Sequence, residues 1–97
     1  MTKAYAPKMP PEVYALAPKL TEAGLRVAWA LAGFMDRAGR CFPSRARIAE
    51  SGGLANLESV TAGVRQLCAL GVVRVRRRQR KSAVYEWVLK SGETHLQ

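Results

Sequence analysis

The chain has 97 residues, of which 48% are hydrophobic and 24% are charged, and this ordinary globular composition argues against wholesale disorder. Lys and Arg together number 16 against 7 Asp and Glu, so the formal net charge is +9. Charge of this sign favours a polyanionic partner, either nucleic acid or an anionic membrane surface. The length fits one domain with a modest single core.

Cysteine usage and hydropathy indicate the cellular compartment in which we expect the protein. Cys41 and Cys68 match no metal-ligand spacing and are too few for a disulfide framework, so we expect reduced thiols and no metal. No apolar run approaches the roughly 18 residues that span a bilayer, and the opening MTKAYAPKMPPEV lacks the apolar core of a signal peptide. We therefore expect a cytoplasmic protein, for which nucleic acid is a more available partner than a membrane.

Residues suited to catalysis are scarce. Asp36 is the only aspartate, and the only histidine, His95, is third from the C-terminus, where chains usually fray. No Cys/His or Ser/His pair is close in sequence, and no Gly-rich phosphate loop follows a strand. The sequence therefore predicts a binding protein that is not an enzyme and needs no cofactor.

Residues 1–19 are expected to form an N-terminal arm, because they contain four of the five prolines. One helical turn is expected over Glu12–Leu16, since a proline stands directly before it and suits a first turn. The apolar side chains of this turn, Val13, Tyr14 and Leu16, are expected to pack on the domain that follows.

A first long helix is predicted after Thr21, an N-cap residue, with Glu22 in the first turn, where a carboxylate suits the helix dipole. Two rows of apolar residues at helical spacing predict a broad buried stripe. The rows are Leu25, Ala28, Trp29, Ala32 and Met35, and then Val27, Leu31 and Phe34. A helix this apolar is expected to be central, and Gly39 is expected to cap its C-terminus.

A short edge strand is expected at 40–42, followed by a second helix with Ser44 as N-cap and with Ile48 and Ala49 facing inward. The run Ser51–Gly53 is expected to end this helix.

A third helix is predicted from the N-cap Asn56 to Gly71, a glycine cap. Its inward residues are expected to be Val60, Val64, Leu67 and Leu70. Gly63 within it costs roughly 1 kcal/mol against alanine, and we expect a neighbouring helix to cross closely there.

The end of the chain changes to period two. Val73 and Val75 alternate with Arg74 and Arg76. After a polar break, Tyr85, Trp87 and Leu89 alternate with Val84, Glu86 and Val88. Such alternation on both sides of a short break predicts a β-hairpin. Within it, Glu86 is expected to pair across the strands with Arg74 or Arg76, which is worth a few tenths of a kcal/mol at a surface.

This order of elements, together with three segments, resembles a winged helix-turn-helix domain, in particular those of plasmid and phage replication proteins and small bacterial regulators. The segments are LTEAGLRVAWALAGFMDRAGRCFPSRARIAE, VTAGVRQLCALGVVRV and AVYEW. The resemblance implies an α+β fold of three helices and a C-terminal hairpin, the wing. The domain would occupy residues 20–90, and 91–97 would be a frayed tail.

In such a fold the third helix would lie in the DNA major groove and the wing would flank it, reaching phosphates or the minor groove. The resemblance places the recognition residues at Asn56, Glu58, Ser59, Thr61 and Arg65. Arg65 suits guanine or phosphate, and Thr61 suits a thymine methyl or a phosphate. Glu58 can accept a hydrogen bond from cytosine, or it only stabilises the helix N-terminus.

Most of the positive charge lies outside this helix. The wing supplies Arg74, Arg76, Arg77, Arg78, Arg80 and Lys81. Arginine suits phosphate forks and narrow minor grooves, although a charged edge against aggregation is the alternative. At the start of the second helix, Ser44, Arg45 and Arg47 are expected to contact the DNA backbone; the alternative is that these arginines are solvated surface residues.

The sequence therefore predicts a protein that binds double-stranded DNA, either a small transcriptional regulator or a replication or maintenance factor of a plasmid or phage. If six phosphates are engaged, the logarithm of the binding constant should fall with log salt at a slope of about −5. The alternative is a protein-interaction module that docks on an acidic partner or forms a homodimer. RNA is a third partner, less favoured because the A-form major groove does not admit a helix.

Overall fold

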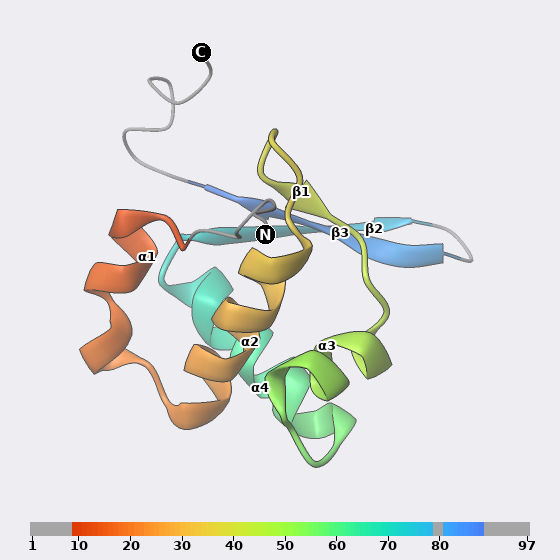
Figure 1. Cartoon of the computed structure of the whole chain (residues 1–97), viewed down its shortest axis with the longest axis horizontal. Coiled ribbons are helices and arrows are strands. Elements are labelled where there is room, and N and C mark those ends of the chain that lie inside the picture. Colours follow the sequence, from red (N-terminus) through yellow and green to blue (C-terminus); the bar gives the residue numbers. More distant parts are fainter. Residues whose placement is uncertain (1–8, 79–80, 89–97) are drawn as a thin grey trace, which may run out of the picture.

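The computed structural model describes residues 9–78 and 81–88, and of Lys81 it describes only the backbone. In this part of the chain, four α-helices and a short 3-10 helix accompany a three-stranded antiparallel sheet, so the fold is α+β as predicted (Figure 1). The elements are α1 Pro11–Ala15, the 3-10 helix Ala17–Lys19, α2 Glu22–Phe34, β1 Arg40–Cys41, α3 Arg45–Gly52, α4 Leu57–Ala69, β2 Val73–Arg78 and β3 Lys81–Trp87. No helix among the described residues is long and apolar enough to cross a membrane.

The predicted arm contributes to the core. Val13 of α1 is 1% exposed and belongs to the same buried cluster as residues of α2 and α4, and Leu16 packs partly against it. Tyr14 was expected to pack as well, but it is 64% exposed, because neighbouring residues of a one-turn helix point in different directions. Residues 1–8 of the arm and the predicted tail 91–97 lie outside the described part.

Helix α2 is central and packs against α3, α4 and β1. Thr21 caps it as predicted, since its hydroxyl accepts a hydrogen bond from the backbone of Gly24 at 3.0 Å. The buried arc is centred on Val27 and Leu31. The prediction that Trp29 is buried is wrong: the side chain is 52% exposed, because steps of about 100° per residue place it opposite that arc.

Helix α2 also ends earlier than predicted. Met35 is already extended, and Gly39, with a φ of +80°, lies in the turn before β1. In this turn the carboxylate of Asp36 accepts a hydrogen bond from the backbone of Arg40 at 3.0 Å. A side chain that binds the backbone in this way competes with helix continuation, so the prediction that Gly39 caps the helix is wrong.

Helices α3 and α4 form the predicted pair joined by a turn. The side chains of Ser44 and Asn56 cap them, each accepting a backbone hydrogen bond, at 3.2 and 2.9 Å. α3 runs through Gly52 and ends at Gly53, whose φ is +69°, so the predicted break falls on its last glycine. Gly71, with a φ of +79°, follows the end of α4 as predicted.

Gly63 marks the place where α4 crosses α2, as predicted. A Cβ at this position would lie 2.7 Å from the carbonyl oxygen of Ala23, and it would also overlap Val27. Side chains do not pack at such distances, so the absence of a Cβ allows the two helices to approach this closely.

The sheet has the order β1-β3-β2, so β3 is its central strand. The edge strand expected at 40–42 is confirmed as β1, in which Cys41 lies opposite Tyr85. The predicted hairpin is confirmed as β2 and β3, with Val75 also opposite Tyr85. Its predicted ion pair joins Arg74 Nη1 and Glu86 Oε1 at 3.4 Å.

The hairpin changes register near its tip. Between the pairs Arg76–Val84 and Arg78–Lys81, β2 advances two residues while β3 advances three. The extra residue makes a bulge, which bends a strand and increases its twist. The bulge therefore alters the direction of the side chains in the last part of β2.

Candidate nucleic-acid interface

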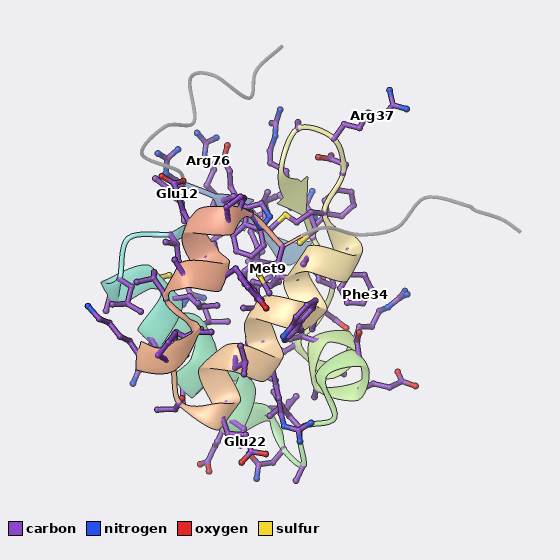
Figure 2. All side chains as sticks on the ribbon, turned by 60° about the vertical axis from the view of Figure 1, so that its left-hand side comes forward. Met9, Glu12, Glu22, Phe34, Arg37 and Arg76 are labelled. Atoms are coloured by element: carbon purple, nitrogen blue, oxygen red, sulfur yellow. The ribbon has the colours of Figure 1, made fainter. Side chains whose placement is uncertain are left out.

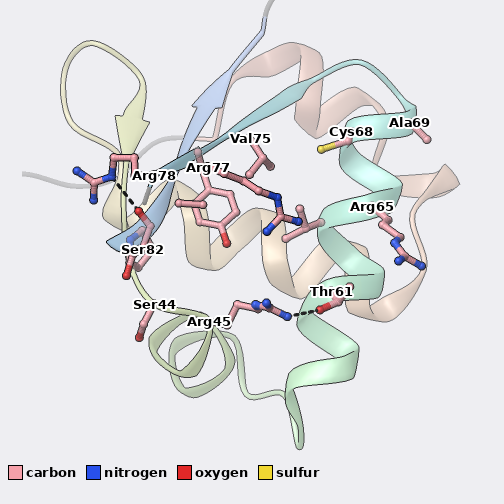
Figure 3. Close-up of a pocket in the computed structure, with 14 residues that line it drawn as sticks. Ser44, Arg45, Thr61, Arg65, Cys68, Ala69, Val75, Arg77, Arg78 and Ser82 are labelled. Carbon is pink, nitrogen blue, oxygen red and sulfur yellow. Dashed lines mark hydrogen bonds between the residues drawn. The ribbon is translucent and has the colours of Figure 1, made fainter. Parts of the chain in front are cut away.

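A groove of about 1140 Å³ lies between α4, the start of α3 and the β2–β3 hairpin (Figure 3). Its apolar walls include Val64 from α4 and Val75 and Ala83 from the hairpin. Its cationic residues come from three elements: Arg45 from α3, Arg65 from α4, and Arg77 and Arg78 from β2. We call this site the arginine groove.

The arginine groove is strongly positive. None of the aspartates and glutamates in the described chain lines it. Arg65 and Arg77 are exposed, and neither has a hydrogen-bond or ion-pair partner among residues 9–78 and 81–88. Figure 3 shows Arg77 pointing from β2 into the groove, towards α4. The charges of these two side chains are therefore available to an anion.

Arg45 is held across the groove. Its Nη1 donates a hydrogen bond to Oγ1 of Thr61 in α4 at 2.9 Å (Figure 3). A guanidinium group carries five N–H donors, so this bond fixes the orientation of the side chain and leaves further donors for a ligand. The same bond occupies the hydroxyl of Thr61 as an acceptor.

Tyr85 of β3 also lines the arginine groove, and its ring is buried. Burial raises the pKa of the phenol, and the positive charges of Arg45 and Arg77 partly offset that rise. Both guanidinium groups therefore lie close enough to act on the phenol. With a raised pKa the phenol stays protonated at neutral pH, and it can donate a hydrogen bond to an anion.

Arg78 joins the hairpin to the loop after β1. Its Nε donates to the carbonyl oxygen of Ser82 at 2.9 Å, and its guanidinium lies over the ring of Phe42, 5.2 Å from the centroid. A cation over an aromatic face is attracted by the ring quadrupole. These two contacts hold the hairpin wall of the groove in place.

The predicted wing residues are not all brought together. Arg77 and Arg78 line the arginine groove, whereas Arg74 and Arg76 do not. Arg74 and Arg76 alternate with the inward-facing valines of β2, so they lie on the other face of the hairpin. Arg76 is exposed on the outside of the molecule (Figure 2).

Two members of the predicted wing set have no described side chain. Arg80 and the side chain of Lys81 lie outside the described part of the structure. Arg74, on the outer face, already has an anionic partner in Glu86. Among the described side chains of the hairpin, the charge that faces the groove is therefore that of Arg77 and Arg78.

Only some of the residues predicted to contact DNA at the start of the second helix line the groove. Ser44 and Arg45 line the arginine groove, but Arg47 does not. The guanidinium of Arg47 lies over the ring of Phe34, 5.5 Å from the centroid. Residues two apart in a helix point in directions about 200° apart, which explains why Arg45 and Arg47 serve different surfaces.

Of the predicted recognition residues, Thr61 and Arg65 line the arginine groove, and Asn56, Glu58 and Ser59 do not. The Oδ1 atom of Asn56 accepts the cap hydrogen bond from the backbone of Ser59. Glu58 is exposed in the first turn of α4, where a carboxylate stabilises the helix.

Tyr85 was not among the residues predicted for the site. The alternation of the hairpin assigned it to the buried face, and this is correct, since it is 5% exposed. The side chain nevertheless borders the groove, because α4 leaves part of that face of the hairpin uncovered. The missed signal was an aromatic residue with a hydroxyl among apolar neighbours.

No known protein family, curated protein or solved structure matches this chain. Its function must therefore be inferred from the chemistry of the arginine groove.

Proposed function

We propose that the chain is a DNA-binding protein of the winged helix-turn-helix class, and that its arginine groove receives the backbone of duplex DNA. One observation carries the proposal. Four arginines from three separate elements converge on one groove, which no carboxylate of the described residues lines. Arginine forks match the geometry of phosphate oxygens, and the DNA backbone offers phosphates at regular spacing.

The arrangement of elements supports the same partner. From α2 onward the order is helix, strand, helix, turn, helix, hairpin, with the groove between α4 and the hairpin. In a winged helix-turn-helix domain, the helix in the place of α4 enters the major groove, and the hairpin flanks it. A DNA strand between these two elements would pass over Arg45, Arg77 and the phenol of Tyr85.

The proposed biological role is regulation of transcription, or replication or maintenance of a mobile element such as a plasmid or phage. A domain that recognises DNA can serve either role, since function depends on the site that is bound and not on the fold.

A protein partner is a second candidate, favoured by one feature of α4. Leu57 is 49% exposed next to the exposed Glu58, and large exposed apolar side chains occur at protein interfaces. This candidate predicts a stable complex or homodimer in sizing experiments, together with DNA binding that is weak and insensitive to salt.

Fluorescence anisotropy of a labelled duplex, measured across a range of salt concentrations, tests the DNA proposal. If each of the four arginines neutralises one phosphate, the slope of log binding constant against log salt is about −3.5. Arg77→Ala should weaken binding about tenfold and reduce the size of the slope by about 1.

The matched control is Arg74→Ala. Arg74 lies in the same strand as Arg77, but on the other face and paired with Glu86, so its removal should change the affinity by less than about threefold. A duplex that does not bind, a flat salt response, or equal losses in the two variants would refute the proposal.

A further inference from the structure

We infer that the protein reads duplex DNA through its phosphates and with little regard to base sequence, because α4 presents few side chains suited to base edges: Thr61 and Gln66 are bonded to other elements, and Leu57 and Ala62 are apolar. This inference rests on the proposed DNA-binding function and specifies the class of DNA that is bound. It departs from the expectation that a recognition helix selects a particular site.

Asn56 and Thr61, the two residues of α4 and its cap that are most suited to base edges near the N-terminus, are both occupied. The side-chain oxygen of Asn56 accepts from the backbone nitrogen of Ser59 at 2.9 Å. The hydroxyl of Thr61 accepts from Arg45 at 2.9 Å. The hydroxyl proton of Thr61 and the amide NH2 of Asn56 can still donate, but only in the directions that these two bonds set.

Gln66, in the second half of α4, is occupied as well. Its Oε1 accepts from the backbone nitrogen of Thr21 at 2.9 Å, and its Nε2 donates to the carbonyl oxygen of Lys19 at 3.3 Å. These bonds tie α4 to the segment before α2. The amide side chains that pair with adenine in two-bond contacts are therefore used for structure at both ends of α4.

The remaining outward residues of α4 offer little for base recognition. Leu57 and Ala62 are apolar, and Glu58 repels phosphates and can only accept hydrogen bonds, from the amino groups of cytosine or adenine. Arg65 lines the same groove as Arg45 and Arg77, where its charge suits the backbone. One good base contact discriminates by about 5- to 150-fold, short of the roughly 10³–10⁷-fold preference typical of site-specific proteins.

The affinity would instead come from the four arginines of the groove. Phosphate contacts position a protein on a duplex and carry no sequence information directly. A protein that relies on them binds duplexes of unrelated sequence with similar affinity and loses that affinity steeply as salt rises.

The first test uses the whole chain to select bound duplexes from a randomised library. The second measures, by anisotropy at one salt concentration, the affinity for several unrelated duplexes of equal length. We expect no enriched motif and dissociation constants within about tenfold of each other. Arg65→Ala should weaken binding to every duplex by the same factor.

Two results would overturn the inference while leaving DNA binding intact. One is an enriched motif with a preference above about 100-fold over random duplex. The other is an Arg65→Ala loss confined to duplexes with guanine at one position. If no duplex binds at all, the proposed function itself fails, so the two failures are distinguishable.

Discussion

Arg45 and Thr61, which are 16 residues apart, join the first turn of α3 to α4 through a hydrogen bond of 2.9 Å between Nη1 and Oγ1. Both residues line the arginine groove. The direction of the Arg45 side chain therefore depends on how α3 and α4 are placed relative to each other. Arg45 is exposed and Thr61 is half-buried, so we expect the hydrogen bond between them to add little to the stability of the fold.

Thr61→Val removes the acceptor and preserves the shape of the side chain. We expect DNA affinity to fall about two- to fivefold, because a net hydrogen bond of about 0.5–1 kcal/mol no longer orients Arg45. The urea concentration at the midpoint of unfolding should shift little. Arg45→Ala, which removes the charge itself, should cause the larger loss of affinity. If Thr61→Val leaves the affinity unchanged in anisotropy, the bond does not position Arg45.

Two glycines give opposite predictions for the same substitution. Gly63→Ala places a Cβ against Ala23 and Val27, and overpacking at such a contact costs about 1–3 kcal/mol. At Gly33, in α2, a Cβ would meet nothing within 4 Å. Gly33→Ala should therefore stabilise the protein by about 0.5–1 kcal/mol. Urea denaturation measures both, and a neutral Gly63→Ala would show that the helices can separate without cost.

Features that depend on a few neighbouring residues could be predicted from the sequence. The caps at Thr21, Ser44 and Asn56 each use a hydrogen bond to a backbone group three residues along, so the residue type nearly determines the contact. The face that Glu86 shares with Arg74 and Arg76 also followed from the alternation, whereas the register that pairs it with Arg74 is known from the structure.

Features that depend on how elements meet could not be predicted in the same way. Trp29 has the helical spacing of a core residue, and its exposure follows only from which sides of α2 the other helices cover. The bulge near Arg77 has no turn signature of its own. The arginine groove forms because α3, α4 and the hairpin meet, and sequence spacing does not reveal which face of each element borders it.

The buried thiol of Cys41 predicts a loss of stability at high pH. Burial, and then the charge of Asp36, raises its pKa from 9.0 to about 12 in the folded protein. The folded state therefore holds this proton more tightly than the unfolded state. The resulting stability is fully present below pH 9 and declines as pH rises towards 12.

Urea midpoints measured at intervals above pH 8.5 (about one half-unit below the thiol's unfolded pKa) check this dependence. Cys41→Ala removes the titrating group, so its midpoint should fall less steeply with pH, although the variant is less stable overall. The raised pKa of Tyr85 acts in the same direction and leaves a residual slope. Identical slopes in the two proteins would exclude a contribution from the Cys41 thiol.

The two thiols should differ in reactivity, and only one should affect DNA binding. Cys68 is exposed and lines the arginine groove, whereas Cys41 is buried. Partial burial of its thiol also raises the pKa of Cys68, so its alkylation should be slow at neutral pH and accelerate as pH rises, because the thiolate is the nucleophile. Iodoacetamide should therefore modify Cys68 first, as mass spectrometry of the peptides would show.

The adduct on Cys68 stands where the DNA backbone is proposed to lie, and the affinity for duplex should fall several-fold. Cys68→Ser, treated with the same reagent, is the control and should keep its affinity. If alkylated protein binds DNA as tightly as untreated protein, the strand does not pass over this part of α4.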